Sequence, residues 1–153
     1  MNTTKNAART LEDMKINVKI KISALWVTLM LFYIYADILG FYTPGNIEKI
    51  MLGEIGGIQI TEGFLLIMAI WMAIPSVMVF LSLTLKANVN RWVNIIVAVL
   101  SIVALAATFL VGEFSMRYTV QAIVEAVMIG LIVWYAWRWP KMGYQGSSVS
   151  SQK

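Results

Sequence analysis

The chain has 153 residues, of which 59% are hydrophobic and 13% charged, and its formal net charge is +4. Soluble domains average roughly 45–50% apolar and about 25% charged residues, so this composition excludes an ordinary soluble globular domain. The chain contains no cysteine and no histidine. This excludes dithiol redox chemistry, histidine-ligated haem and ordinary zinc sites, and we predict no bound cofactor and no metal site.

Four apolar runs are long enough to cross a bilayer, which requires about 20 residues of helix. They cover residues 20–42, 61–85, 92–111 and 118–139. We therefore predict an all-α integral membrane protein, with a four-helix bundle over residues 20–142, a segment at 1–19 before it and a disordered tail at 143–153. No cleavable signal peptide is expected, because the first apolar run follows a polar segment and lacks a small-residue cleavage site after it.

The basic residues indicate the topology. Ten of the twelve lie in the N-terminal segment, in the loop between the second and third spans, or at the C-terminal end. Cytoplasmic loops of membrane proteins carry the excess of Lys and Arg, so both termini are predicted to be cytoplasmic. An even number of spans agrees with this placement. Because topology accounts for the positive charge, we do not predict a nucleic-acid partner; the lipid bilayer is the expected one.

The segments around the first span carry local signals. Residues 10–13 (Thr-Leu-Glu-Asp) fit a capping box. This signal is compatible with a helix on the membrane surface, and equally with a partly unwound segment that leads into the first span. After the first span, residues 43–45 (Thr-Pro-Gly) predict a turn. Residues 46–60 suggest a short amphipathic helix that Gly56-Gly57 breaks, and Thr61 is a good N-cap for the second span.

Pro75 lies near the middle of the second span, where it removes a backbone donor and bends the helix. A structural kink is favoured over a gating hinge. The third and fourth spans each repeat a small residue at every fourth position, which lets helix backbones approach closely. We expect these residues to pack the two helices against each other or across a homo-oligomer interface. They are Ala104, Thr108 and Gly112 in the third span and Ala122, Ala126 and Gly130 in the fourth.

Aromatic residues gather near both predicted membrane surfaces. At the cytoplasmic level they are Trp92, Trp134, Tyr135, Trp137 and Trp139. Belts of this kind anchor helices at the lipid headgroups, and we favour this interpretation over the stacking of a cofactor.

Ionisable residues inside the spans carry the functional interpretation. Asp37 lies in the first span and Glu125 in the fourth. A charged side chain at the bilayer centre costs roughly 2.5–3.5 kcal/mol on insertion scales, and such residues usually face a bundle interior or a wet cavity. At the helical rise per residue, Asp37 lies about 8 Å below the outer end of its span and Glu125 about 10 Å deep. Glu62, Glu113 and Arg117 stand at helix ends in the same outer half.

Two interpretations of these charges stay open. In the first, Asp37 and Glu125 share an outward-facing, carboxylate-lined cavity, with Arg117 as counter-charge and Glu62 and Glu113 at the rim. In the second, Asp37 is a buried structural acid, Glu125 pairs with Arg117, and the acids at helix ends have structural roles such as favourable interaction with a helix dipole. Hydrogen bonds can come from Gln121, one turn from Glu125, and from Tyr33, Tyr35, Tyr42 and Tyr118.

The first interpretation predicts a non-enzymatic protein that binds a small cationic or amphipathic ligand, or that supports proton-linked transport, since two carboxylates in low dielectric cannot both ionise cheaply. The second predicts a structural or accessory subunit of a membrane complex. A membrane enzyme is the least favoured class, because no nucleophile–base pair and no cofactor motif is visible.

Several stretches together resemble a family of small bacterial and archaeal four-span membrane proteins of unknown function. They are Val18–Trp26, Tyr33–Asp37, Met72–Ser76, Asn90–Ile95 and Ile132–Pro140. The resemblance covers nearly the whole chain and implies the four-helix fold and little else. It implies no activity and no site residue. We expect the protein in the inner (plasma) membrane of a prokaryote. At a remoter level the layout is similar to DoxX-like four-helix bundles, with no shared motif.

Overall fold

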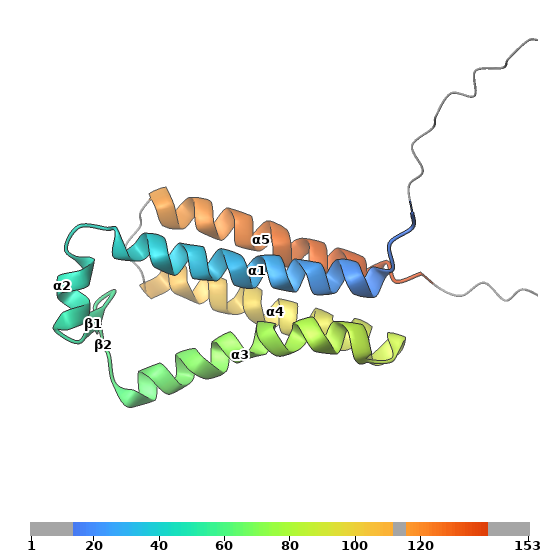
Figure 1. Ribbon diagram of the computed structural model, residues 1–153, viewed down its shortest axis with the longest axis horizontal. Helices are drawn as coiled ribbons and strands as arrows, with labels where there is room; N and C mark the ends of the chain where they lie inside the picture. Colours follow the sequence, from blue (N-terminus) through green and yellow to red (C-terminus); the bar gives the residue numbers. More distant parts are fainter. Residues whose placement is uncertain (1–13, 112–115, 141–153) are drawn as a thin grey trace, which may run out of the picture.

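The computed structural model describes residues 14–111 and 116–140, and folds them into five helices and one small hairpin (Figure 1). Four helices are long and apolar enough to cross a membrane. They are α1 (Val18–Phe41), α3 (Glu62–Thr84), α4 (Ala87–Val111) and α5 (Met116–Trp137). The short helix α2 (Asn46–Met51) and the strands β1 (Glu54–Ile55) and β2 (Ile58–Gln59) connect α1 to α3. The predicted helical architecture with four candidate spans is therefore confirmed.

The largest shift in a boundary concerns α4, which begins at Ala87, five residues before the predicted start at residue 92. The Asn90 N–H already bonds to the carbonyl of Lys86 at 2.8 Å. Hydropathy marks only the apolar part of a helix, and the first turns of α4 are polar. The predicted capping box at residues 10–13 and the tail at 143–153 lie outside the described residues.

The connection from α1 to α3 contains the predicted short helix, followed by a hairpin that the sequence analysis did not predict. The glycine pair Gly56-Gly57 forms its turn, with φ of 56° and 81°. Positive φ at both central residues is the conformation that a two-residue hairpin turn of type I′ requires. As predicted, Thr61 caps α3, and its side chain accepts a hydrogen bond from the Phe64 N–H at 3.1 Å.

The four long helices lie roughly along one direction (Figure 1). We name the end where α1 begins and α5 ends the termini end, and the end that carries α2 and the hairpin the loop end. Helix α3 packs along α1 near the termini end and leans away from it toward the loop end (Figure 1). Pro75 is buried within α3 and has no N–H to donate to the carbonyl of Trp71.

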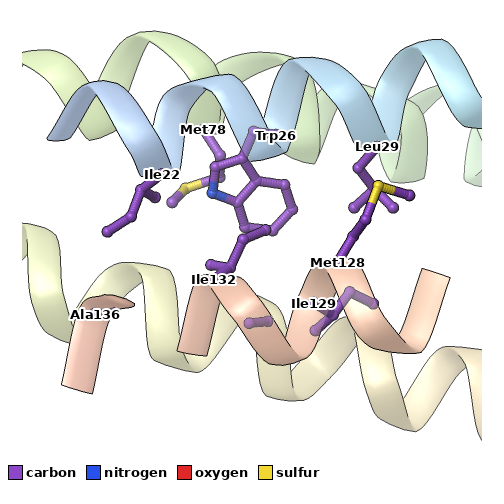
Figure 2. Close-up of a cluster of buried hydrophobic side chains, with 9 residues drawn as sticks. Ile22, Trp26, Leu29, Met78, Met128, Ile129, Ile132 and Ala136 are labelled. Atoms are coloured by element: carbon purple, nitrogen blue, oxygen red, sulfur yellow. The ribbon is translucent and has the colours of Figure 1, made fainter. Parts of the chain in front are cut away.

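A cluster of buried apolar side chains joins all four long helices. Its largest member is Trp26 of α1, which is fully buried and points toward Ile132 of α5 (Figure 2). The other members are Ile22 and Leu29 of α1, Met78 of α3, Ala98 of α4, and Met128, Ile129 and Ala136 of α5. In the loop half of α3, by contrast, Leu65, Leu66 and Ile67 are more than half exposed. The tightly packed half of the bundle is thus the termini half.

A buried polar cluster crosses this core, and we name it the asparagine network: Trp26, Ser82, Asn90 and Asn94. The indole N–H of Trp26 and the hydroxyl of Ser82 both donate to Asn94 Oδ1, at 2.7 and 3.1 Å. The Asn94 amide donates to Asn90 Oδ1 at 2.6 Å, and the Asn90 amide to the Ser82 carbonyl at 2.6 Å. Because an unpaired polar group is costly in an apolar interior, these bonds fix the mutual register of α1, α3 and α4.

A lysine from α1 caps the end of α3. Lys19 Nζ donates to the carbonyl oxygens of Leu83 at 3.2 Å and Leu85 at 2.6 Å. The change Lys19→Met should lower the free energy of unfolding by about 1–2 kcal/mol, since charge-assisted bonds contribute roughly 1.5–3 kcal/mol and this site is partly exposed. Unfolding in mixed micelles titrated with a denaturing detergent measures it.

The matched control is Lys15→Met, because Lys15 is exposed and precedes α1. Equal losses of stability in the two variants would contradict the capping role of Lys19.

Candidate functional site

Three polar residues follow one face of α5. Arg117, Gln121 and Glu125 are spaced by four residues, so they lie one above the other along the helix. Arg117 is next to the first residue of α5, and Glu125 lies nine residues after Met116, roughly 14 Å along the axis. We name these three residues the polar ridge. It runs from the loop end to near the middle of the 22-residue helix.

The deep end of the ridge is bonded to α1. The hydroxyl of Tyr33 donates a hydrogen bond to Glu125 Oε1, and both side chains are half-buried. The second interpretation from sequence had Arg117 as the partner of Glu125. The structure gives Glu125 the hydroxyl of Tyr33 instead, which was one of several candidate donors. A polar pair between two spanning helices at this depth stabilises their contact, because lipid tails offer no hydrogen bond.

Arg117, at the shallow end of the ridge, contacts the backbone of α1. Its Nη1 donates to the carbonyl of Ala36 at 3.4 Å, and its guanidinium lies 4.6 Å from the ring centroid of Tyr118. The guanidinium also lies close to Gly40 of α1, where a Cβ would be in ordinary van der Waals contact with Arg117 Nη1, at 3.7 Å. Among the described residues, these contacts of Arg117 involve no carboxylate. The structure therefore does not show Arg117 as the counter-charge of Asp37 and Glu125.

A groove of about 490 Å³ lies between α1 and α5 beside Arg117 and Gln121. We name it the α1–α5 groove. Its walls are mainly apolar, and its size falls within the range of about 300–1,000 Å³ that is usual for small-molecule sites. The lining residues are Phe32, Tyr35, Ala36 and Leu39 of α1, and Met116, Arg117, Val120 and Gln121 of α5.

Four of the predicted site residues therefore meet at this groove. Tyr35, Arg117 and Gln121 line it, and Tyr118 packs against Arg117. The apolar wall was missed, although its signal is present in the sequence. The α1 residues stand at positions i, i+3, i+4 and i+7 counted from Phe32, which is the spacing of one helix face.

The predicted acids do not come together. The side chain of Asp37 is exposed, because one residue beyond Ala36 the helix has turned by about 100° away from the groove. Glu62 is exposed at the start of α3, which leans away from α1 (Figure 1), and Glu113 lies outside the described residues. None of the groove-lining residues is acidic. Within residues 14–111 and 116–140, no three acidic side chains lie close enough to hold a metal ion.

The small-residue repeats of α4 and α5 are also split: some of their positions are buried and others are exposed. Ala122 of α5 is buried, whereas Ala126 and Gly130 are exposed, and a Cβ on Gly130 would meet no atom within 4 Å. On α4, Ala104 is half-buried and Thr108 exposed, and Gly112 lies outside the described residues. Three of the five described positions are therefore exposed, although α4 and α5 do pack against each other.

Four apolar spanning helices, with a polar ridge between the first and the last, define a multi-pass membrane protein. The chain belongs to the family of unknown function DUF6326, whose profile matches residues 11–145. The resemblance inferred from the sequence is thereby confirmed for the family. No curated protein and no solved structure matches the chain, and the remote likeness to DoxX-like bundles stays a prediction.

Proposed function

We propose that this protein is a non-enzymatic membrane protein that binds a small amphipathic ligand in the α1–α5 groove. The observation that carries the proposal is the combination of an apolar wall with Arg117 and Gln121 in one hollow. An alkyl or aromatic portion of the ligand packs against Phe32, Leu39 and Val120. Its polar group accepts hydrogen bonds from the guanidinium of Arg117 or the amide of Gln121.

The lining of the groove favours a neutral or anionic polar group on the ligand. Arg117 is a fixed cation with several N–H donors, and guanidinium groups bind carboxylates and phosphates well. A cationic ligand, which the sequence also allowed, has less support because the groove lacks an acidic wall residue. Glu125, one turn beyond Gln121, does not line the groove and is bonded to Tyr33.

Binding has more support than transport through the bundle. Between Tyr33 and the termini end, the interior is filled by Trp26 and its apolar neighbours. The cavity beside Tyr33 and Pro75 has only about 10 Å³, which is enough for one water molecule. The indole of Trp26, a donor only, points to Asn94, so the asparagine network offers protons no continuous relay past it.

The basic residues support an orientation for the groove. Lys15, Lys19, Lys21, Lys86 and Arg91 all lie at the termini end. The excess of basic residues supports placing this end in the cytoplasm, with the loop end outside the plasma membrane of a prokaryotic cell. The groove is then reached from the outer leaflet or the extracytoplasmic side.

The change Val120→Trp should fill the groove and abolish ligand-induced thermal stabilisation while leaving the melting temperature without ligand nearly unchanged. The ligands are decanoate, decylphosphocholine and decyltrimethylammonium, which share a chain length and differ in head charge. Melting is followed by tryptophan fluorescence of the protein in lipid nanodiscs. Decanoate should stabilise the wild type most, since Arg117 is the charged residue of the groove.

The matched control is Val127→Trp, because Val127 is as exposed as Val120 (57% against 55%) and lies outside the groove. A normal decanoate response in Val120→Trp would reject the groove as the site. A response abolished by Asp37→Asn would instead restore the carboxylate-lined cavity, since Asp37 does not line the groove.

A structural or accessory subunit is the second candidate function, and one observation favours it. Ala126 and Gly130 form an outward-facing strip of small residues on α5, with open space at Gly130. Such a strip fits a helix of a second copy or of another membrane protein. Gly130→Leu should then lower the mass of the purified assembly in native mass spectrometry, whereas an unchanged mass would count against this candidate.

A further inference from the structure

Three cations at the termini end rest on aromatic rings, and together we name them the basic collar: Lys21, Arg91 and Arg138. Lys21 Nζ of α1 lies 5.3 Å from the ring centroid of Tyr135. The guanidinium of Arg91 on α4 lies 5.2 Å from Trp137 and 5.7 Å from Trp92. The guanidinium of Arg138, directly after α5, lies 4.1 Å from Trp134.

No described carboxylate is placed to neutralise the collar. Of the acids that the structure describes, Glu125 lies near the middle of α5 and the others lie toward the loop end: Asp37, Glu48, Glu54 and Glu62. Within the described part of the chain, Arg91 Nε is buried without a hydrogen-bond partner. Lys19 differs from the collar, because its ammonium is already bonded to two carbonyls of α3.

Cation–π contacts position a charge without neutralising it. An aromatic face attracts the cation, but a guanidinium or ammonium still carries N–H groups that can donate to an anion. The rings of Trp134 and Trp137 are themselves more than half exposed, as expected for residues that lie among lipid headgroups. Cations held at that level, with donors free, suit the phosphate of an anionic phospholipid.

We propose that the basic collar binds the headgroups of anionic phospholipids in the leaflet at the termini end. The lipid phosphate accepts hydrogen bonds from the collar, while its acyl chains lie along the apolar outer surface of α5. The collar is at the opposite end of the bundle from the α1–α5 groove (Figure 1), so this inference does not rest on the proposed function.

The experiment measures the preference of the full-length protein for lipid. Protein in mixed micelles is exposed to equimolar phosphatidylglycerol and phosphatidylcholine, and the lipids retained are counted by native mass spectrometry. The wild type should retain phosphatidylglycerol preferentially. Each collar residue contributes about a fivefold preference for the anionic lipid, since a basic residue near an anionic surface is worth roughly a factor of that size. The triple change K21Q/R91Q/R138Q should therefore remove most of the preference.

Three controls keep the result interpretable. K49Q removes a charge at the loop end and should retain the wild-type preference. The double change K21Q/R138Q leaves Arg91 in place and tests the collar if the triple variant fails to fold. Inorganic phosphate, added in competition, should not displace the lipid if the membrane is the source of the anion.

Two outcomes would overturn the proposal. One is a wild-type lipid preference in K21Q/R138Q. The other is a wild type that retains phosphatidylglycerol and phosphatidylcholine equally.

Discussion

Replacing Asn94 by leucine should lower the free energy of unfolding by about 2–4 kcal/mol. Asn94 is fully buried and accepts hydrogen bonds from Trp26 and Ser82 while it donates to Asn90. Hydrogen bonds between membrane helices average about 0.6 kcal/mol and reach roughly 1.7 kcal/mol each, so the loss of these bonds accounts for part of the change. The remainder comes from the indole N–H of Trp26 and from Asn90 Oδ1, which both lose their partner, since buried groups left unpaired cost about 1–3 kcal/mol each.

Reversible unfolding in mixed micelles, followed by tryptophan fluorescence, provides the measurement. Asn88→Leu is the matched control, because Asn88 is an exposed residue of the same helix. The change Trp26→Phe keeps an aromatic ring but removes the N–H. It should lower the free energy of unfolding by less than Asn94→Leu does. If Asn94→Leu were as stable as the wild type, the asparagine network would have no role in holding α1, α3 and α4 together.

Removing the hydroxyl of Tyr33 should lower the free energy of unfolding by about 1–2 kcal/mol when Glu125 is present. It should leave the free energy of unfolding nearly unchanged when Glu125 is replaced by leucine. The hydroxyl is a donor to Glu125 in the half-buried contact of α1 with α5. Tyr33→Phe leaves the carboxyl group without this donor, and a bond of this kind between helices is worth up to about 1.7 kcal/mol. In the Glu125→Leu background there is no acceptor left to lose.

A double-mutant cycle of Tyr33→Phe and Glu125→Leu in the same unfolding assay isolates this coupling. Tyr35→Phe is the control, because Tyr35 is 65% exposed. Additive effects of the two changes would show that the pair contributes nothing to stability. The decanoate response of Tyr33→Phe is a separate test, since a weakened response with intact stability would place the pair in the ligand site.

The two proposals assign different roles to the two halves of the bundle. The termini half contains the apolar cluster around Trp26 and the asparagine network, which make it the better packed half. The loop half contains the α1–α5 groove and the outer part of α3, whose apolar side chains are largely exposed. Regions with fewer buried contacts open more easily. A rigid termini half and a loop half that adjusts to a ligand therefore agree with the proposed groove site.

The sequence by itself determined the four spans, the helix between the first two, and the cap at Thr61. These features depend on local properties: the length of an apolar run, the spacing within one helix, and the hydrogen bond of a side chain to its own turn. The sequence also placed Gln121 and Glu125 on one face of a helix, whereas Arg117 was expected just before that helix and lies inside α5. It missed the asparagine network: Asn90 lies before the predicted start of the third span, and the bonds of Asn94 to Trp26 and Ser82 join different helices, which a spacing within one helix does not show.

Only the tertiary structure decided which residues meet. Asp37 and Glu125 lie at similar predicted depths, yet Glu125 bonds to Tyr33 while Asp37 is exposed. The inward face of a membrane helix is hard to read from sequence, because lipid tails are as apolar as the protein core and both sides of the helix carry similar residues. The rotation of α1 about its axis and the lean of α3 follow from the packing of all four helices together, so the partners of each polar side chain emerge only from that packing.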